Sequence, residues 1–137
     1  MTVVYADVTD QPLDAAAIEA LVLSDSDGAL VTFRGVVRDA DGGKEVSALD
    51  YRAHPDAARI LRECCEAVSV ETGVTLAAAH RFGALTVGDV ALVAAAASPH
   101  RAEAFAACQL LVDRIKAEVP IWKKQHYPDG ESDWVGL

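Results

Sequence analysis

The chain has 137 residues, of which 52% are hydrophobic, and a formal net charge of -9. This much apolar material is enough for one domain, spanning residues 1–137, with its own hydrophobic core. The acidic balance excludes a general binder of nucleic acid or of anionic membranes, because both depend on a basic face.

Cysteine usage and apolar runs set the expected compartment. Cys64, Cys65 and Cys108 give neither a paired disulfide framework nor a CxxC metal spacing, so we expect a reducing cytosol and no metal site. Residues 1–7 lack the basic start and apolar centre of a signal peptide, and the longest apolar run, 90–97, is too short to span a bilayer. We expect a cytoplasmic protein that does not enter the membrane.

The first half of the chain predicts a strand, a helix and two further strands. Residues 3–8 are rich in β-branched side chains, and helical spacing of apolar residues follows over 13–22. A strand over 29–38 contains Gly35, which indicates a bulge or a close approach of another backbone. A flexible loop over 39–44 precedes a strand over 46–51. We expect this strand to pair with the strand over 29–38.

The second half predicts two longer helices around two strands. Pro55 opens a helix that runs to about Thr72 and ends at Gly73. Strands are expected over 74–82 and 85–97, with a turn at 87–89, and the alanine run within 94–97 indicates close packing against a helix. Mixed helices and strands without regular βαβ alternation predict an α+β two-layer domain.

The last helix has an unusual first turn. Ser98 is a suitable N-cap and Pro99 a suitable first residue, and an apolar stripe continues through Phe105 to Val119. His100 and Arg101 place positive charge where the helix dipole favours negative charge. Two interpretations stay open, namely an anion such as phosphate held at this end, or side chains that point into water or pair with Glu103.

A small set of cations is the strongest chemical signal in this acidic chain. No GxSxG, HExxH, P-loop or Rossmann fingerprint is present. Such a set, with aromatic residues beside it in the sequence, suits a ligand that carries a phosphate and a flat ring. The set comprises Arg38, His100, Arg101, Lys116, Lys123 and Lys124.

Four separated motifs resemble those of the molybdopterin synthase catalytic (large) subunit family. The resemblance covers most of the chain, from about Gly28 to Trp134. The motifs are Phe33-Arg34-Gly35-Val36-Val37-Arg38, His80-Arg81-Phe82-Gly83-Ala84-Leu85 with Gly88-Asp89, Ser98 to Phe105, and Ile115-Lys116 through Trp122-Lys123-Lys124.

The resemblance implies an α/β-hammerhead-like fold and a homodimer. Each protomer would carry one copy of a small, ubiquitin-like sulfur-carrier subunit, which gives a heterotetramer. The family's reaction converts a cyclic pyranopterin monophosphate into molybdopterin, with sulfur from the carrier's C-terminal Gly-Gly thiocarboxylate. The cysteines of this chain therefore need not be catalytic, and no cofactor is implied.

The same resemblance assigns roles to residues of this chain. Lys116 and Lys123 would be the catalytic lysines. The residues that bind the substrate would be Arg38, His100 and Arg101, with Lys124 and Gln125 lining the same pocket. His80 and Arg81 lie within a strand pattern, and we interpret them as structural.

The last predicted helix places the candidate residues His100 and Lys116 at its two ends. His100 and Lys116 are separated by about 24 Å at a rise of about 1.5 Å per residue. One small ligand cannot contact both residues in a single chain. We therefore predict a shared site in which one protomer supplies Arg38, Lys116 and Lys123, and the other supplies His100 and Arg101.

Two other functions compete with this interpretation. A non-catalytic dimeric module that binds a phosphorylated metabolite or a protein tail would explain the cations equally well. An acyl- or thioester-processing enzyme could use Cys64 or Cys65 as its nucleophile, although no candidate base lies near these cysteines in the sequence.

Overall fold

The computed structural model describes residues 2–136, which form three helices and ten strands. The helices are α1 (Ala15–Val22), α2 (Ala57–Thr72) and α3 (Arg101–Glu118). The strands are β1 (Val3–Thr9), β2 (Ala29–Val36), β3 (Ala40–Asp41), β4 (Lys44–Glu45), β5 (Ala48–Ala53), β6 (Thr75–Arg81), β7 (Gly83–Thr86), β8 (Val90–Ser98), β9 (Ile121–His126) and β10 (Ser132–Gly136). Within residues 2–136, no helix combines the length and apolar character needed to cross a bilayer.

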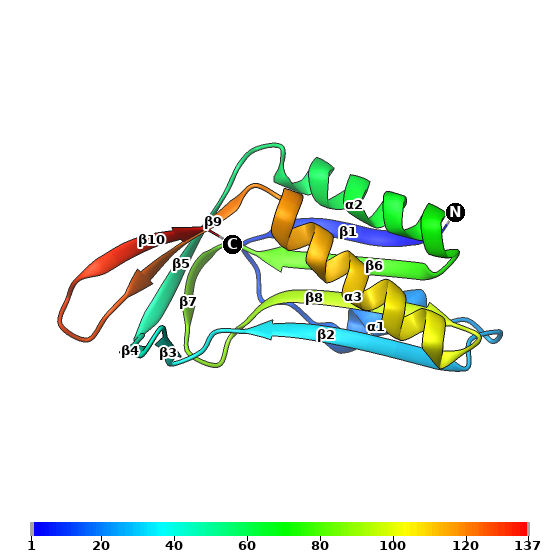
Figure 1. Ribbon diagram of the computed structural model, residues 1–137, viewed down its shortest axis with the longest axis horizontal. Coiled ribbons are helices and arrows are strands. Elements are labelled where there is room, and N and C mark those ends of the chain that lie inside the picture. Colours follow the sequence, from blue (N-terminus) through cyan, green and yellow to red (C-terminus); the bar gives the residue numbers. More distant parts are fainter. Residues whose placement is uncertain (1, 137) are drawn as a thin grey trace.

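One four-stranded sheet, called the larger sheet here because its strands are longer, forms the centre of the domain. Its strand order is β1-β6-β8-β2. β1 runs parallel to β6, and the other neighbouring strands are antiparallel. Figure 1 shows α2 and α3 lying together across one face of this sheet. α1 packs on the opposite face, so the expected α+β class is confirmed and α1 adds a partial third layer.

The alanine run in β8 explains how helices reach both faces. Ala94 and Ala96 belong to the core beneath α2 and α3, whereas Ala95 and Ala97 pack against α1. All four residues are at most 1% exposed. Successive side chains of a strand point to opposite faces, so small residues at successive positions let helices approach from both sides. The expected close packing is confirmed.

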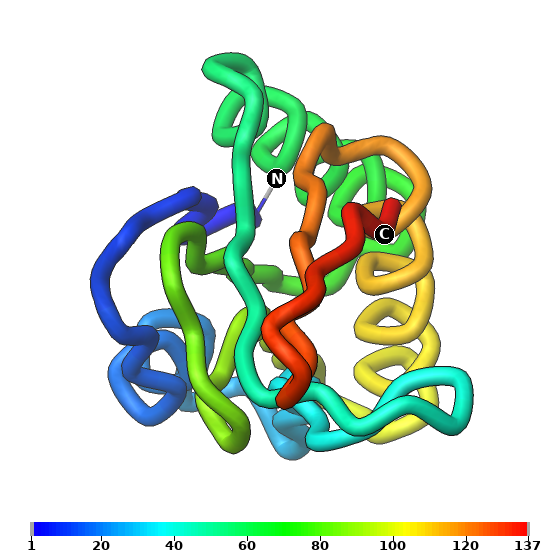
Figure 2. Tube along the Cα trace, turned by 90° about the vertical axis from the view of Figure 1, so that its left-hand side faces the viewer, coloured from blue at the N-terminus to red at the C-terminus, as the bar shows by residue number. Residues whose placement is uncertain are grey.

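A second sheet, with strand order β10-β9-β5-β7, stands at one end of the larger sheet. Figure 2 looks onto it and shows its four strands side by side. β9 and β10 were not predicted, and in β9 the cations Lys123 and Lys124 interrupt the apolar pattern after Pro120. Alternation is nevertheless present in β9, where Ile121 and Gln125 are buried and Trp122 is exposed.

One expectation about strand pairing is wrong. β5 pairs with β7 and β9, not with β2, because the short β3–β4 hairpin directs the chain into the second sheet. The turn expected at 87–89 is confirmed, because the backbone N–H of Asp89 donates to the carbonyl of Thr86 at 3.0 Å, and it divides the segment 85–97 into two strands. β7 then belongs to the second sheet and β8 to the first.

The bulge expected at Gly35 is confirmed. The pairing of β2 with β8 shifts register between Gly35 and Val36. A Cβ atom at Gly35 would lie 3.3 Å from Cβ of Leu92, which is tighter than ordinary contacts. The glycine therefore permits the close approach of β8 at this bulge.

The start of α3 differs from expectation. Ser98 is buried and pairs with Ala29 as the last residue of β8, so its backbone is held extended and cannot begin a helix. His100 is the N-cap instead, and α3 begins at Arg101. Phe105, expected in the buried stripe, is 62% exposed.

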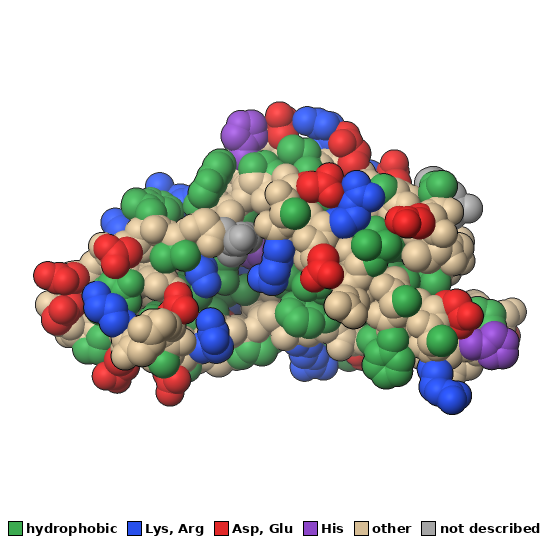
Figure 3. All heavy atoms as spheres, viewed as in Figure 1, with side chains coloured by type: hydrophobic (Ala, Val, Ile, Leu, Met, Phe, Trp, Pro, Cys, Tyr) green, Lys and Arg blue, Asp and Glu red, His purple; other side chains and the backbone are tan. Residues whose placement is uncertain are grey.

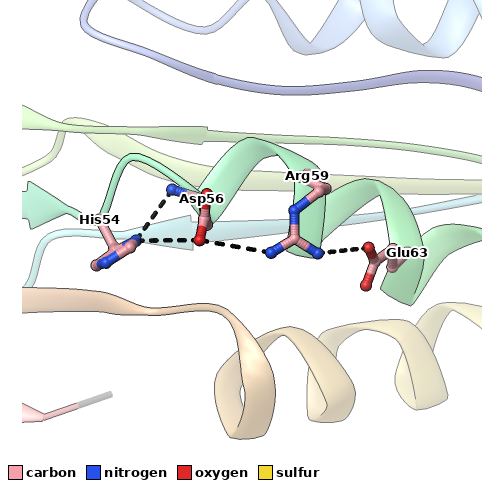
Figure 4. Close-up of polar contacts among 4 residues, drawn as sticks. All are labelled: His54, Asp56, Arg59 and Glu63. Atoms are coloured by element: carbon pink, nitrogen blue, oxygen red, sulfur yellow. Dashed lines mark hydrogen bonds and ion pairs between the residues drawn. The ribbon is translucent and has the colours of Figure 1, made fainter.

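The start of α2 carries a chain of exposed ion pairs (Figure 4). The backbone N–H of Asp56 donates to Nδ1 of His54 at 3.0 Å, and the Asp56 carboxylate lies 3.5 Å from the Arg59 guanidinium. Arg59 also donates to Glu63 at 2.7 Å. α2 ends at Gly73 with a φ of 73°, which confirms the expected glycine stop.

Candidate functional site

A cavity of about 240 Å³ lies where the second sheet meets the larger sheet, beside the last turns of α3. β2, β5, β6, β8, β9 and α3 all contribute to its wall. Figure 3 shows Lys and Arg side chains gathered around the hollow between the second sheet and α3. The polar and aromatic side chains of the wall include Phe33, Arg38, Tyr51, His80, Lys116 and Lys123.

The cavity brings together three of the residues assigned from the sequence. Arg38 follows β2, Lys116 lies in the last turn of α3, and Lys123 lies on β9. The first and last of these positions lie 85 positions apart in the sequence, and only the meeting of the two sheets places them around one volume. The arrangement can bind an anion and can deliver amines to it.

Lys123 has a perturbed electrostatic environment. Its pKa is lowered from 10.5, chiefly by burial, which disfavours the charged amine. The positive charges of Lys116 and Arg38 lower the pKa further, while the Asp41 carboxylate raises it. A larger fraction of this amine is therefore neutral near physiological pH than for an ordinary lysine, which suits proton transfer.

Gln125 lies next to this cavity, in a smaller one of about 40 Å³ that Arg38, Asp41 and Lys123 also line. Its Nε2 donates to Oδ2 of Asp41 at 2.6 Å, and the Tyr127 hydroxyl donates to its Oε1 at 3.2 Å. Asp41 in turn lies 3.7 Å from the Arg38 guanidinium. Gln125 therefore holds Asp41 beside Arg38, which lines the larger cavity, but Gln125 itself does not line that cavity.

Lys124 points away from both cavities. Side chains alternate along β9, so Lys124 faces the side opposite to Lys123 and Gln125. Its Nζ lies 5.6 Å from the centre of the Trp134 ring, a cation–π contact within the second sheet. The structure of one chain does not bring Lys124 to the site.

His100 and Arg101 are exposed at the other end of α3. The helix runs from Arg101 to Glu118, so these two residues are separated from Lys116 by nearly its whole length. The structure of one chain therefore does not bring them to the cavity of Lys116 and Lys123.

His80 was interpreted as structural, yet it lines the cavity. It is 3% exposed, and its Nδ1 lies 2.8 Å from the carbonyl oxygen of Arg81. The Tyr51 ring packs edge-on against the imidazole, with the ring centres 5.2 Å apart. Strand alternation was the available signal, because His80 shares a face with Leu76 and Ala78 at the strand end that borders the second sheet.

The three cysteines are buried away from this cavity. Burial raises the pKa of the Cys65 thiol to about 12, and it also raises the pKa values of Cys64 and Cys108. These thiols are therefore protonated at neutral pH, and a buried thiol is a poor nucleophile. The thiol-nucleophile hypothesis finds no support here.

Comparison with known proteins relates the chain to one family. The family model described as "MoaE protein" matches residues 8–118. The "Molybdopterin synthase catalytic subunit 1" of Mycobacterium tuberculosis is 41% identical, over 96% of this chain and 90% of that protein. The "Molybdopterin synthase catalytic subunit" of a Nostoc species is 39% identical, over 95% and 81% respectively.

The fold is similar to that of a solved structure from the same family. The crystal structure of molybdopterin synthase from Staphylococcus aureus matches with a TM-score of 0.90 and 31% identity, over 96% of this chain and 97% of that one. The family model spans most of the chain, and both the sequence and the fold agree with it. The chain belongs to the MoaE family.

Proposed function

We propose that this chain is the catalytic subunit of a molybdopterin synthase. The observation that carries the proposal is the convergence of Arg38, Lys116 and Lys123 on one cavity of about 240 Å³. The names of its relatives support the same activity. The substrate is the cyclic pyranopterin monophosphate, and the product is the dithiolene of molybdopterin.

The cations have separate roles in this proposal. Arg38 binds the phosphate, because a guanidinium presents a planar fork of donors that matches phosphate oxygens. Lys116 and Lys123 stabilise the negative, tetrahedral centre that forms at the thiocarboxylate carbonyl, and Lys123 also moves a proton. The lowered pKa of Lys123 supports the second role.

The sulfur donor is a small carrier subunit that ends in a Gly-Gly thiocarboxylate. Its C-terminal tail reaches the cavity, where the lysine amines bind the thiocarboxylate. The reaction takes place in the cytosol, where the unpaired thiols of this chain stay reduced.

A homodimer completes the site. His100 and Arg101 of the second copy supply the phosphate contacts that one chain cannot provide. An apolar groove of about 620 Å³ along α3 and the edge strand β2 supports pairing of two copies, because Phe105 is 62% exposed there. With one carrier on each protomer, the assembly is a heterotetramer.

Reconstitution tests the proposal. The purified chain, the thiocarboxylated carrier and the pterin precursor are mixed, and the dithiolene product is assayed. We expect product with the wild-type chain and a loss of at least about 100-fold in turnover for Lys116→Ala or Lys123→Ala. The matched control is Lys44→Ala, since Lys44 lies on β4 and does not line the cavity.

The same assay distinguishes a non-catalytic module. A carrier that ends in an ordinary carboxylate should give no product, although it should still bind. Tight binding of the precursor without turnover by the complete mixture would contradict the enzymatic proposal and would favour a binding module.

A further inference from the structure

His80 lines the cavity of Lys116 and Lys123, yet the proposed reaction gives it no role so far. It is 3% exposed and lies near the end of β6, where the larger sheet meets the second sheet. A buried polar side chain at this position must satisfy its hydrogen-bonding groups. The two ring nitrogens of His80 do so in different ways.

The contact of Nδ1 determines the tautomer. Nδ1 lies 2.8 Å from the carbonyl oxygen of Arg81. A carbonyl oxygen can only accept a hydrogen bond, so Nδ1 carries the hydrogen atom. In the neutral ring, Nε2 then has a lone pair and no hydrogen, and it can only accept.

Nε2 is available to a ligand. Among residues 2–136, Nε2 has no hydrogen-bond partner. Nor is it one of the fully buried polar atoms that lack a partner, so part of it is accessible. Because His80 is almost fully buried and its accessible part lines the cavity, the free edge of the ring faces that cavity. The Tyr51 ring, packed edge-on at 5.2 Å, holds the imidazole in this orientation.

The ring is uncharged at neutral pH. Burial lowers the pKa of His80 to about 4, and the positive charge of Lys116 lowers it as well, while the bond to the Arg81 carbonyl opposes both. The cationic side chains that line the cavity offer only donors while they are protonated, and they are Arg34, Arg38, Lys116 and Lys123. A neutral acceptor among these donors recognises a different part of the ligand.

We propose that Nε2 of His80 is a specificity-determining acceptor in this cavity, which takes a hydrogen bond from an N–H or O–H group of an anionic ligand. Arg38, Lys116 and Lys123 pair with the negative groups of that ligand, and His80 selects the donor group beside them. The identification of the ligand as the pterin precursor rests on the proposed function, whereas the tautomer and the acceptor role do not.

Two conservative variants separate the two ring nitrogens. His80→Asn keeps an amide N–H near the position of Nδ1, so it can still donate to Arg81, but it places no atom near Nε2. His80→Gln carries an amide oxygen that can reach the position of Nε2 and accept there. A purely structural role depends on the bond to Arg81, and an acceptor role depends on Nε2.

Steady-state kinetics of the reconstituted enzyme give the first readout. We expect His80→Asn to raise the KM for the pterin precursor by about tenfold, the effect of one lost hydrogen bond, and His80→Gln to stay within about threefold of wild type. Thermal melting of both variants accompanies the kinetics. A His80→Asn enzyme with an unchanged KM, or equal damage in both variants, would overturn the acceptor role.

Nitrogen NMR of the imidazole gives a readout that does not depend on activity. In the free wild-type protein, Nδ1 should show the signal of a protonated nitrogen and Nε2 that of a bare one, and addition of the pterin precursor should shift the Nε2 signal. A protonated Nε2 in the free protein would refute the inference even in an active enzyme. A shifted Nε2 signal in a protein without turnover would instead contradict the proposed function and leave the acceptor role intact.

Discussion

Gln125 on β9 donates a hydrogen bond from Nε2 to Oδ2 of Asp41 on β3, with a distance of 2.6 Å, across 84 residues of the chain. Gln125 is 4% exposed, and its Oε1 accepts from the Tyr127 hydroxyl at 3.2 Å. The bond to Gln125 is the main reason that the pKa of Asp41 lies below its ordinary value, and Lys123 and Arg38 contribute to the same shift. The carboxylate is thereby held beside the two cations.

Replacing this donor by a carboxylate should destabilise the protein. In Gln125→Glu, two acceptors would face each other at a buried position, so one of them would have to bind a proton. We expect a melting temperature at pH 7 that is lower by roughly 5 °C. A carboxyl group whose pKa is raised in the folded state stabilises the fold at pH values below its unfolded-state pKa, and this stabilisation is lost as pH rises. The loss of melting temperature in Gln125→Glu should therefore shrink toward pH 4.

The double variant Asp41→Asn with Gln125→Glu is the control for this pair. It restores one donor and one acceptor with the roles exchanged, so it should melt closer to wild type than Gln125→Glu does. An equally low melting temperature in the single and double variants would show that the pair interaction is not the cause.

Lys123 should titrate below the ordinary lysine value of 10.5, as measured by NMR of its side chain across a pH series. Two substitutions should move the midpoint in opposite directions. Lys116→Met removes a positive charge and should raise it, whereas Asp41→Asn removes a negative charge and should lower it further. Lys124→Met, on the opposite face of β9, is the control. A midpoint that neither cavity variant moves would contradict the electrostatic account.

A shared site makes a prediction about mixed dimers. Lys116→Ala and His100→Ala chains should each be inactive alone. After equal mixing and subunit exchange, half of the dimers are mixed and each has one intact site of two, so we expect about a quarter of wild-type activity. Exchange is followed with two affinity tags, and unrestored activity despite proven exchange would exclude the shared site.

Acid should destabilise the wild-type protein through His80. The folded-state pKa of His80 is about 4 and its ordinary value is 6.5, so the unfolded chain binds a proton first as pH falls. Stability attributable to His80 is therefore intact above pH 6.5 and falls by up to about 3 kcal/mol toward pH 4. Urea unfolding at several pH values measures this fall.

His80→Gln provides the reference for that series because it lacks the titrating group. The difference in unfolding free energy between wild type and His80→Gln should change in favour of the variant between pH 6.5 and pH 4. A difference that stays constant over this range would show that His80 titrates normally.

Local patterns in the sequence determined most of the secondary structure. Pro55 and Gly73 indicated the two ends of α2, and Gly73 is its C-cap. The alanine run of β8 indicated close packing, which occurs on both faces of the sheet. These features follow from short-range sterics and from the periods of helices and strands, so neighbouring residues are enough to specify them.

Only the tertiary structure decided which residues meet. β5 pairs with β7 and β9, and this pairing brings Lys123 opposite Tyr51 and close to Arg38 and Lys116. It also places His80 on the cavity wall. Strand pairing across two sheets depends on packing between residues far apart in the chain, and no local period encodes it.

The acidic composition and the few cations indicated an anion site from the sequence alone. The structure showed that Arg38, Lys116 and Lys123 share one cavity, while His100, Arg101 and Lys124 do not reach it within a single chain. The reason is geometric, because the length of α3 and the alternation of β9 fix where each side chain points.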